Sequence, residues 1–295
     1  MAMPPLLRAM RPHQWTKNVL VAAVPLAAGK LLAPAILLQT VAAFIVFCLA
    51  ASATYLINDT VDVEADRAHP TKHTRPIAAG ELAPRAAVIA AVVLIVVAEL
   101  IAFLVAPDLA AVLAAYVAVT LSYSLWLKHE PVIEMAFLAL GFLLRAIAGA
   151  AATGIAVSSW FLIVAGFGSL FMAAGKRSSE LNSALTASGS TDPPKATRKV
   201  LTGYTPGYLR FVWATAASVT ITAYCLWAFE VAVVQSTLPW AKLSIIPFVL
   251  AIMRYAVDID RDTAEAPDRV VLSDRTLLGM GVLWVVTFGL GALGV

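Results

Sequence analysis

The chain has 295 residues, of which 61% are hydrophobic and only 13% are charged, and its mean hydropathy is +0.85. Soluble domains are about 45–50% apolar and about 25% charged, so this composition excludes a soluble enzyme and predicts a polytopic membrane protein. The formal net charge is only +3, and we expect no nucleic-acid partner.

Nine segments of the chain are apolar and long enough to cross a bilayer as helices. They cover approximately residues 18–32, 36–57, 86–106, 109–127, 132–153, 159–175, 208–229, 239–257 and 276–294. We therefore predict an all-α fold with nine transmembrane helices, in a single membrane-embedded domain over residues 1–295. The first span is the weakest, since it is short and contains Pro25. Residues 1–29 also have features of a signal peptide, with positive charges before an apolar run and small residues after it, but Trp15, Lys17 and Asn18 together favour an interfacial anchor.

The distribution of positive charges predicts the orientation of the chain in the cell membrane. Of the 21 Lys and Arg residues, Lys30 and Lys242 fall in loops on one side, and Arg145 lies within a span. The others lie at the N-terminus or in loops on the opposite side, which the positive-inside rule makes cytoplasmic. The most polar loops then meet at the cytoplasmic end of the helices; they are residues 58–85, 176–207 and 254–275.

Two other features of the chain carry less information. Cys48 and Cys225 both lie within predicted spans and suggest neither a disulfide nor a metal site. Residues 183–197 are rich in Ser, Thr, Ala and Pro, and we expect this stretch to be mobile.

The segment before the first span contains polar residues that could face either lipid or substrate. Trp15 suits the aromatic belt at the membrane interface, and Lys17 could extend to lipid headgroups. Alternatively, Lys17 and Asn18 turn inward and contact a substrate phosphate. The residues themselves leave both interpretations open.

An acidic stretch follows the second, uncharged span. Asn58, Asp62 and Asp66 are spaced four residues apart, so in a continuous helix they share one face, with Asp59 beside them. Unpaired carboxylates this close repel one another, and a divalent cation relieves the repulsion. Oxygen ligands favour Mg²⁺ over zinc or copper, and Mg²⁺ prefers a few carboxylates together with substrate phosphates. The stretch predicts a Mg²⁺–diphosphate site at a membrane surface; the alternative is a solvated acidic helix end.

Basic residues come directly after the acidic stretch. Arg offers phosphate oxygens a bidentate fork and Lys offers them a compact charge. The candidates are Arg67, Lys72 and Arg75, which could equally be ordinary cytoplasmic positive charges. His69 and His73 are poor metal candidates, because Pro70 disfavours a continuous helix through them.

Arg145 lies in the middle of the fifth span. A charge at this depth costs at least roughly 2.5–3.5 kcal/mol on insertion scales, so an intramembrane arginine is a candidate functional residue. Arg145 could meet an anionic lipid headgroup, or it could simply pair with Glu134 or with an inward-facing Asp.

Charged residues also follow the sixth span. Lys176 and Arg177 suggest a second phosphate contact, with Glu180 as a further ligand for a metal or for a sugar hydroxyl. The alternative is a group of positive charges that merely marks the cytoplasmic side. Most charges of the loop 254–275 are expected to be solvated.

The acidic stretch resembles the first aspartate motif of the UbiA superfamily of intramembrane prenyltransferases, in the form Asn58-Asp59-x-x-Asp62-x-x-x-Asp66. The resemblance implies nine transmembrane helices around a central cavity, with Mg²⁺-bound diphosphate under a cytoplasmic cap. Most members carry a second Asp-rich motif after the sixth helix. Residues 175–180 occupy that position here with one carboxylate, Glu180, which argues against ordinary prenyl transfer.

Four stretches resemble one subgroup of that family, the decaprenyl-phosphate phosphoribosyltransferases of actinobacteria. They are residues 11–18, residues 69–80, residues 175–181, and residues 254–258 together with Asp274-Arg275. The resemblance implies transfer of a 5-phosphoribosyl group from phosphoribosyl diphosphate (PRPP) to a polyprenyl phosphate such as decaprenyl phosphate, with Mg²⁺ as cofactor and diphosphate as leaving group. It also implies a homotrimer and a place in the synthesis of the arabinose donor of mycobacterial-type cell walls.

These observations and the resemblance together define a predicted site. The catalytic residues are expected to be Asp59, Asp62 and Asp66, and the metal ligands Asn58, Asp62 and Asp66. The substrate-binding residues are expected to be Lys17, Asn18, Tyr55, Lys72, Arg75, Arg145, Lys176, Arg177 and Glu180.

Two other functions compete with this interpretation. A UbiA-type prenyltransferase, which moves an isoprenyl group from its diphosphate to an aromatic or lipid acceptor, needs the same metal site. A transporter or non-catalytic scaffold is disfavoured, because transporters keep functional polar groups near the bilayer midplane. Here the polar groups gather at one end of the helices.

Overall fold

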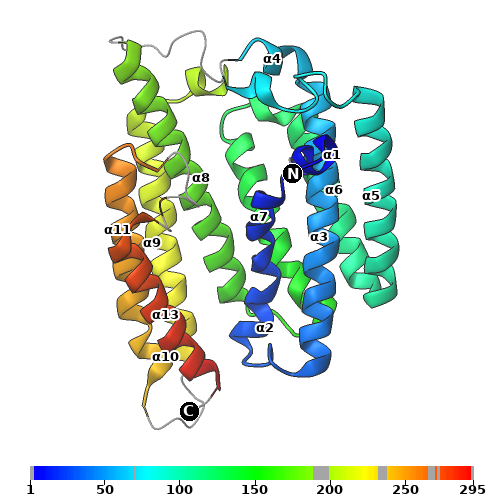
Figure 1. Ribbon diagram of the computed structural model, residues 1–295. Helices are drawn as coiled ribbons and strands as arrows, with labels where there is room; N and C mark the ends of the chain where they lie inside the picture. Colours follow the sequence, from blue (N-terminus) through cyan, green and yellow to red (C-terminus); the bar gives the residue numbers. More distant parts are fainter. Residues whose placement is uncertain are drawn as a thin grey trace. The chain divides into compact units, whose positions relative to one another are not determined.

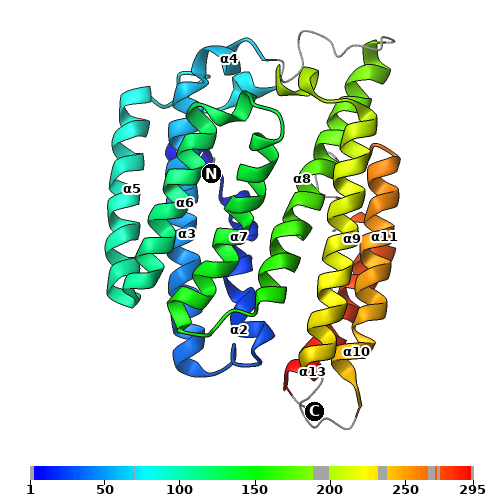
Figure 2. The ribbon, with the colours of Figure 1, turned by 180° about the vertical axis from the view of Figure 1, so that it is seen from behind.

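The computed structural model describes residues 3–69, 71–188, 199–231, 238–264, 270 and 273–293. Within these ranges the chain forms α-helices, short 3₁₀ helices and turns, and no β-strand. The predicted all-α fold is therefore confirmed. Figure 1 labels the helices in chain order, and Figure 2 shows them from behind.

The chain divides into two compact units, and each is described by itself. The first unit comprises Met1–Leu127 and Leu144–Ala156, and the second comprises Lys128–Leu143 and Val157–Val295. One helix, α7 (Ile133–Thr153), contributes its first part to the second unit and its last part to the first. The single domain predicted for residues 1–295 stays a prediction.

The first unit is built around the long helix α3 (Pro34–Val61), which packs against α5 (Pro84–Val105) and α6 (Pro107–Leu125) (Figures 1 and 2). Each of these helices begins with a proline, whose fixed φ suits the first helical turn and whose missing N–H costs nothing there. The shorter elements of this unit are α1 (Pro5–Ala9), η1 (Pro12–Ala22), α2 (Ala23–Ala27), α4 (Val63–Arg67) and η2 (Lys72–Thr74).

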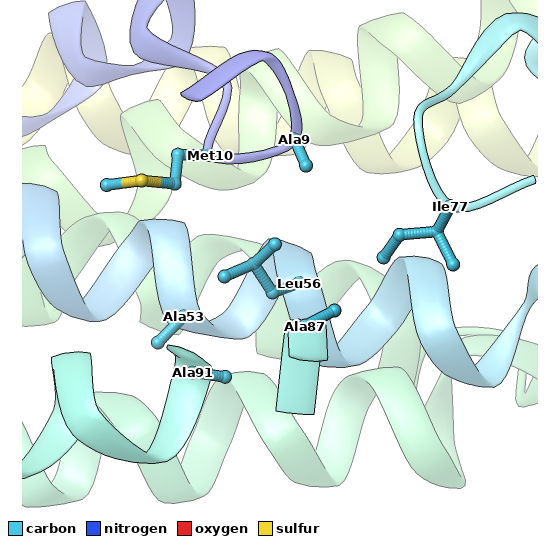
Figure 3. Close-up of a cluster of buried hydrophobic side chains, with 7 residues drawn as sticks. All are labelled: Ala9, Met10, Ala53, Leu56, Ile77, Ala87 and Ala91. Carbon is cyan, nitrogen blue, oxygen red and sulfur yellow. The ribbon is translucent and has the colours of Figure 1, made fainter. Parts of the chain in front are cut away.

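A cluster of buried apolar side chains fixes the N-terminal segment onto the polar end of α3. Leu56 lies at its centre, with Met10 on one side and Ile77, from the loop before α5, on the other (Figure 3). Ala53 of α3 and Ala87 of α5 are fully buried, and such small side chains let two helices approach closely. This packing brings residues 10–18 and the loop 75–82 to the end of α3 that carries the acidic residues.

Helix α7 touches η1 backbone to backbone. A Cβ atom built on Gly149 would lie 1.8 Å from the carbonyl oxygen of Val21. We expect Gly149→Ala to push η1 away from α7 and to destabilise the protein by about 1–3 kcal/mol or more, the usual cost of overpacking. Thermal unfolding in detergent would measure this loss.

Gly279 provides the matched control for that substitution, because nothing lies within 4 Å of a Cβ atom built on it. Gly279→Ala should leave the unfolding temperature unchanged or raise it slightly, since alanine is the better helix former by up to about 1 kcal/mol. If Gly149→Ala unfolds at the same temperature as Gly279→Ala, the close approach of α7 and η1 is wrong.

The second unit is built from α8 (Ser159–Ser188), α9 (Pro206–Val231), α10 (Trp240–Leu243), α11 (Ile245–Asp260) and α13 (Arg275–Leu293), with the short η4 (Lys199–Gly203) before α9. Helix α8 packs along α9, and α11 packs along α13 (Figure 2). An aromatic cluster that includes Tyr224, Phe248 and Trp284 joins α9, α11 and α13.

Seven helices within the described ranges are long and apolar enough to cross a membrane. They are α3, α5, α6, α7, α8, α9 and α13. The other two predicted spans are broken: residues 18–32 form the end of η1, then α2 and a turn at Gly29, and residues 239–257 form α10 and most of α11. Helix α11 has 16 residues, or about 24 Å, against the roughly 30 Å of a bilayer core. The count of nine spans therefore stays a prediction.

The predicted boundary between the sixth span and its loop is wrong. Helix α8 continues to Ser188, so Lys176, Arg177 and Glu180 lie on a helix and not in a loop. Good helix formers at these positions, together with an Arg177–Glu180 ion pair three residues apart, explain the continuation. Of the stretch predicted to be mobile, residues 183–188 belong to α8 and residues 189–197 lie outside the described ranges.

Candidate active site

The acidic stretch spans a break between two helices. Helix α3 ends at Val61, Asp62 has a non-helical ψ of 9°, and α4 begins at Val63. The hydrogen bonds nevertheless keep the four-residue spacing, because the Asp62 N–H donates to the Asn58 carbonyl (2.9 Å) and the Asp66 N–H donates to the Asp62 carbonyl (2.8 Å). The helix is therefore not continuous through Asp62, but the four-residue spacing of the candidate oxygen ligands is kept.

Two arginines neutralise the buried carboxylates of this stretch. Asp59 is only 2% exposed, and Nη2 of Arg11 donates to both of its oxygens at 2.6 and 2.7 Å. Nη1 of Arg75 donates to Asp59 (3.1 Å) and to Asp66 (2.6 Å). We call this set, Arg11 and Arg75 on Asp59 and Asp66, the arginine clamp. The sequence predicts that a divalent cation relieves the repulsion between these carboxylates. In the structure, the two arginines relieve part of that repulsion.

Arg11 is a member of the site that sequence reasoning passed over. It has a φ of 53°, in the left-handed region, and its guanidinium carbon lies 4.9 Å from the centre of the Tyr55 ring. This cation–π contact places Tyr55, a predicted substrate-binding residue, beside the arginine clamp. Arg11 lies 48 positions before Asp59 in the sequence. No local sequence pattern therefore indicates that these two residues pair.

The candidate oxygen ligands at the helix break suit a metal that arrives with a phosphorylated substrate. Asn58 and Asp62 are both half-buried at the helix break. Among the residues the structure describes, no three His, Cys, Asp or Glu side chains gather closely enough to hold an ion by themselves. Mg²⁺ is typically bound by one or two carboxylates, with water and substrate phosphate completing its shell, so this sparse donor set suits it.

The two histidines after the acidic stretch bond to their own loop. The Nδ1 atom of His69 accepts the backbone N–H groups of Thr71 and Lys72, and His73 bonds to the carbonyl of His69. Partial loss of hydration lowers the pKa of His69, and the charge of Lys72 lowers it further. The expectation that neither histidine is a metal ligand stays a prediction.

Arg145 is held in a buried polar network of the first unit. Its Nε donates to the side-chain oxygen of Asn18 and its Nη2 donates to the hydroxyl of Tyr116, both at 2.8 Å. The Asn18 amide also donates to the sulfur of Cys48 (3.3 Å). The structure therefore brings together Asn18 and Arg145, which were predicted from opposite ends of this unit's sequence.

The alternative pairing of Arg145 with Glu134 is wrong. Both residues lie on α7, eleven positions apart, which corresponds to about 16 Å along a helix. Glu134 instead binds Arg177.

The N-terminal segment faces inward in this unit. Asn18 is fully buried, and the Trp15 indole N–H donates to the Ser52 hydroxyl of α3 (3.0 Å). Of the two interpretations of this segment, the structure favours the inward one for Asn18. Lys17 and Lys72, the remaining cations predicted for this unit, are half-buried.

The second unit contains a separate charged cluster around Arg177. This arginine is 2% exposed, its Nε and Nη2 donate to the two oxygens of the fully buried Glu134 at 2.6 and 2.8 Å, and its Nη1 donates to Glu180 at 2.5 Å. The Lys176 amino group lies 3.8 Å from Glu180 and is more exposed than Arg177. Arg177 is thus committed to two carboxylates, and Lys176 is the better placed of the two cations to meet a phosphate.

The start of α7 is fixed to this cluster by Tyr204. The tyrosine hydroxyl accepts the backbone N–H of Val132 (2.7 Å), a β-branched residue with a φ of 69°, which is a rare conformation. Burial raises the pKa of Tyr204 to about 12, so the phenol stays neutral at physiological pH. Glu134 and Tyr204 were not predicted as site residues. The only signal for Glu134 was a carboxylate at the edge of an apolar span.

Comparison with known protein families identifies the class of the chain. Residues 19–278 match the UbiA prenyltransferase family, and the chain belongs to this family of transferases. Its seven long apolar helices make it a multi-pass membrane protein.

The individual relatives point to one subgroup within this family. The chain is 46% identical over 288 residues to the decaprenyl-phosphate phosphoribosyltransferase of Corynebacterium glutamicum, covering 95% of this chain and 84% of that protein. It is 46% identical to the protein of the same name from Mycobacterium tuberculosis, covering 96% and 93%, and 45% identical to that of Mycolicibacterium smegmatis, covering 96% and 91%. The subgroup indicated by the short motifs is confirmed.

Solved structures support the fold alone. A UbiA homologue from Archaeoglobus fulgidus bound to DMAPP and Mg²⁺ matches with a TM-score of 0.72 at 16% identity, covering 98% of this chain and 99% of that one. The same homologue bound to Cd²⁺ matches with a TM-score of 0.68, covering 99% and 100%.

Proposed function

We propose that this protein transfers a 5-phosphoribosyl group from PRPP to a polyprenyl phosphate such as decaprenyl phosphate, with release of diphosphate and with Mg²⁺ as cofactor. The observation that carries the proposal is the 46% identity, along almost the whole chain, to proteins named for this transfer. The acidic stretch at the end of α3 supplies donors suited to a metal diphosphate. We place the site on the cytoplasmic side, because most of the cations lie on that side of the predicted spans.

The chemistry of the acceptor reduces the need for a general base in the protein. A phosphate monoester is already anionic near neutral pH, so its oxygen needs little help from a general base. The difficult part is the loss of diphosphate from C1, during which positive charge develops on the ribose ring. The site must therefore stabilise a leaving group with several negative charges.

The first unit provides side chains that would stabilise the departing diphosphate. Asn58, Asp62 and Asp66 would hold Mg²⁺, which as a Lewis acid would offset the charge of the departing diphosphate. The arginine clamp holds Asp59 and Asp66 in place, so their oxygens need no reorganisation when substrate binds. Lys17 and Lys72, both half-buried in this unit, would add positive charge.

Two further groups are assigned to substrate phosphates. The Arg145 guanidinium lies in the interior of the first unit, oriented by Asn18 and Tyr116, and would attract a phosphate there. In the second unit Lys176 would bind either the ribose 5-phosphate or the lipid phosphate, with Arg177 and Glu180 as positioning residues beside it.

A donor-competition assay tests the proposed function. Purified protein should transfer labelled ribosyl phosphate from PRPP to polyprenyl phosphate and should give no product with farnesyl diphosphate as donor. In-line attack also predicts inversion at C1, which NMR of the product would show. Transfer from farnesyl diphosphate, without transfer from PRPP, would overturn the proposal and favour the prenyltransferase alternative.

A further inference from the structure

Three helices of the second unit enclose a cavity that the proposed reaction does not use. It has a volume of about 280 Å³ and lies between α8, the start of α9 and the end of α11, which run side by side (Figure 2). Small-molecule sites usually have about 300–1,000 Å³, so this cavity suits a group of the size of a lipid headgroup. Its lining includes Ser178 and Asn182 of α8, Gly207, Arg210 and Trp213 of α9, and Asp260 of α11.

Ser178 brings an unsatisfied hydroxyl to this cavity. The residue is only 5% exposed, and its hydroxyl forms no hydrogen bond with the residues that the structure describes. Ser169, earlier on the same helix, instead donates to the carbonyl of Ala165 (2.6 Å). The Ser178 oxygen is not fully enclosed by protein atoms, so it is accessible from the cavity that the residue lines. Most buried polar side chains have a partner, and this one calls for a partner from outside the protein.

Contacts between α8 and the end of α11 hold the walls of the cavity in place. The Asn182 amide donates to Oδ1 of Asp262 (2.8 Å), just after α11. A Cβ atom built on Gly175 of α8 would lie 2.4 Å from Cδ1 of Ile259, so the two helices approach closely there. The spacing of α8 and α11 is therefore fixed, and the cavity needs no rearrangement to receive a ligand.

Arg210 and Asp260 place one charge of each sign at the cavity. Their side chains are 69% and 60% exposed, and Nη2 of Arg210 donates to Oδ1 of Asp260 at 3.0 Å. An exposed ion pair contributes only about 0–1 kcal/mol, so both groups can turn to a ligand at little cost. Among the described lining residues these two are the only charged ones, and the lining has no net charge.

An exposed apolar stripe on α11 leads to the cavity. Its residues follow one another at alternating intervals of four and three positions, so they share one face of the helix. The stripe consists of Ile246, Leu250, Met253 and Val257, and Asp260 continues it at the cavity. In a multi-pass membrane protein an exposed apolar helix face suits contact with lipid chains. A phospholipid whose chains follow this stripe would bring its headgroup to the cavity.

The charges of the cavity select one class of headgroup. A purely anionic headgroup would be repelled by Asp260, and a purely cationic one by Arg210. A headgroup with a phosphate and a primary ammonium satisfies both, because the phosphate accepts from Arg210 and Ser178 and the ammonium donates to Asp260. Trp213 adds an aromatic ring of the kind that lies at headgroup level. We propose that this cavity binds the headgroup of a zwitterionic aminophospholipid such as phosphatidylethanolamine. The proposal does not depend on which donor the enzyme uses.

Lipid competition on the purified, full-length protein tests the proposal. The protein is placed in nanodiscs with equal amounts of phosphatidylethanolamine, phosphatidylcholine and phosphatidylglycerol, and the lipids that it retains are identified by native mass spectrometry. It should retain phosphatidylethanolamine over phosphatidylcholine by at least about tenfold, because choline has no N–H group to donate to the Asp260 carboxylate. Equal retention of these two lipids, or a preference for phosphatidylglycerol, would overturn the proposal.

Hydrogen–deuterium exchange locates the bound lipid. Exchange in residues 206–210, at the start of α9, should slow when phosphatidylethanolamine replaces phosphatidylcholine in the nanodisc. Exchange that slows elsewhere in the described chain, with no change in residues 206–210, would show that the lipid binds at another place and would contradict the proposal.

Three variants decide whether the named groups are responsible. Asp260→Asn should remove the preference for phosphatidylethanolamine over phosphatidylcholine, and Ser178→Ala should weaken retention by about tenfold, as expected for one hydrogen bond to a charged group. Gly207→Leu should fill the cavity and abolish selective retention. Nothing lies within 4 Å of a Cβ atom built on Gly207, so this variant is expected to fold.

Gly279→Leu is the matched control for Gly207→Leu. It adds the same side chain to an equally open position on α13, outside the cavity lining, and should retain phosphatidylethanolamine as the natural protein does. A preference that persists in Asp260→Asn, or retention by Gly207→Leu equal to that by Gly279→Leu, would overturn the proposal.

Discussion

Alanine in place of Asp62 should lower phosphoribosyl transfer by at least about a hundredfold, the typical effect of removing one group that stabilises transition-state charge. Asp62 lies at the break between α3 and α4, half-buried, and the arginine clamp holds Asp59 and Asp66 instead. Its removal therefore takes away a proposed metal ligand and leaves the clamp intact. Turnover with saturating PRPP and Mg²⁺ measures the effect, and an unchanged unfolding temperature would show that the fold is retained.

Glu64→Ala is the matched control for Asp62→Ala. Glu64 lies on the same short helix, α4, and its side chain is 82% exposed beside Arg67. This variant should keep nearly full activity, because an exposed ion pair contributes little. Near-normal turnover by Asp62→Ala, or an equal loss in Glu64→Ala, would refute the metal role of Asp62.

Glu134→Gln should produce the largest loss of stability in the second unit. The glutamate is fully buried and forms a bidentate pair with Arg177, which is also buried. Removing one partner of a buried ion pair costs up to about 3–5 kcal/mol, and the remaining Arg177–Glu180 pair offsets only a part of this loss. Chemical unfolding in detergent would measure the change in the free energy of unfolding.

Two comparisons make this prediction specific. Arg210→Gln breaks the exposed pair with Asp260 and should change the free energy of unfolding by less than about 1 kcal/mol. The double variant Glu134→Leu with Arg177→Met should recover much of the stability lost by Glu134→Gln, because apolar replacement of a whole buried pair is often neutral. A Glu134→Gln protein as stable as Arg210→Gln would contradict the buried pair.

The fold was predictable wherever hydrophobicity alone decides it. Long apolar runs such as those of α3 and α5 have no alternative to a membrane-crossing helix. The prediction failed where a helix extends past its apolar part, as in α8, because Lys176 to Ser188 are polar but still favour a helix. It was also inconclusive for residues 18–32, where a 3₁₀ helix replaces the start of the expected span.

The pairings within the candidate site could not be predicted from the sequence. The four-residue spacing of Asn58, Asp62 and Asp66 predicts oxygen ligands, and local hydrogen bonds preserve that spacing, but their role as metal ligands stays a prediction. No pattern in the sequence could reveal that Arg11 reaches Asp59, since the pair depends on how the N-terminal segment packs over Leu56.

The same limit applies to the second unit. Arg177 was expected to meet a phosphate, yet its partners are Glu134 and Glu180. A pairing over 43 positions follows from tertiary packing and leaves no periodic trace in the sequence. The homotrimer implied by the resemblance stays a prediction.

Calorimetry of PRPP binding tests the central claim most directly. The protein in detergent should bind PRPP in the presence of Mg²⁺, lose that binding when EDTA removes the ion, and lose it as well in Asp62→Ala with Mg²⁺ present. PRPP binding of equal affinity with and without Mg²⁺, or equal binding by the Asp62→Ala protein, would contradict a metal-dependent donor site at the end of α3.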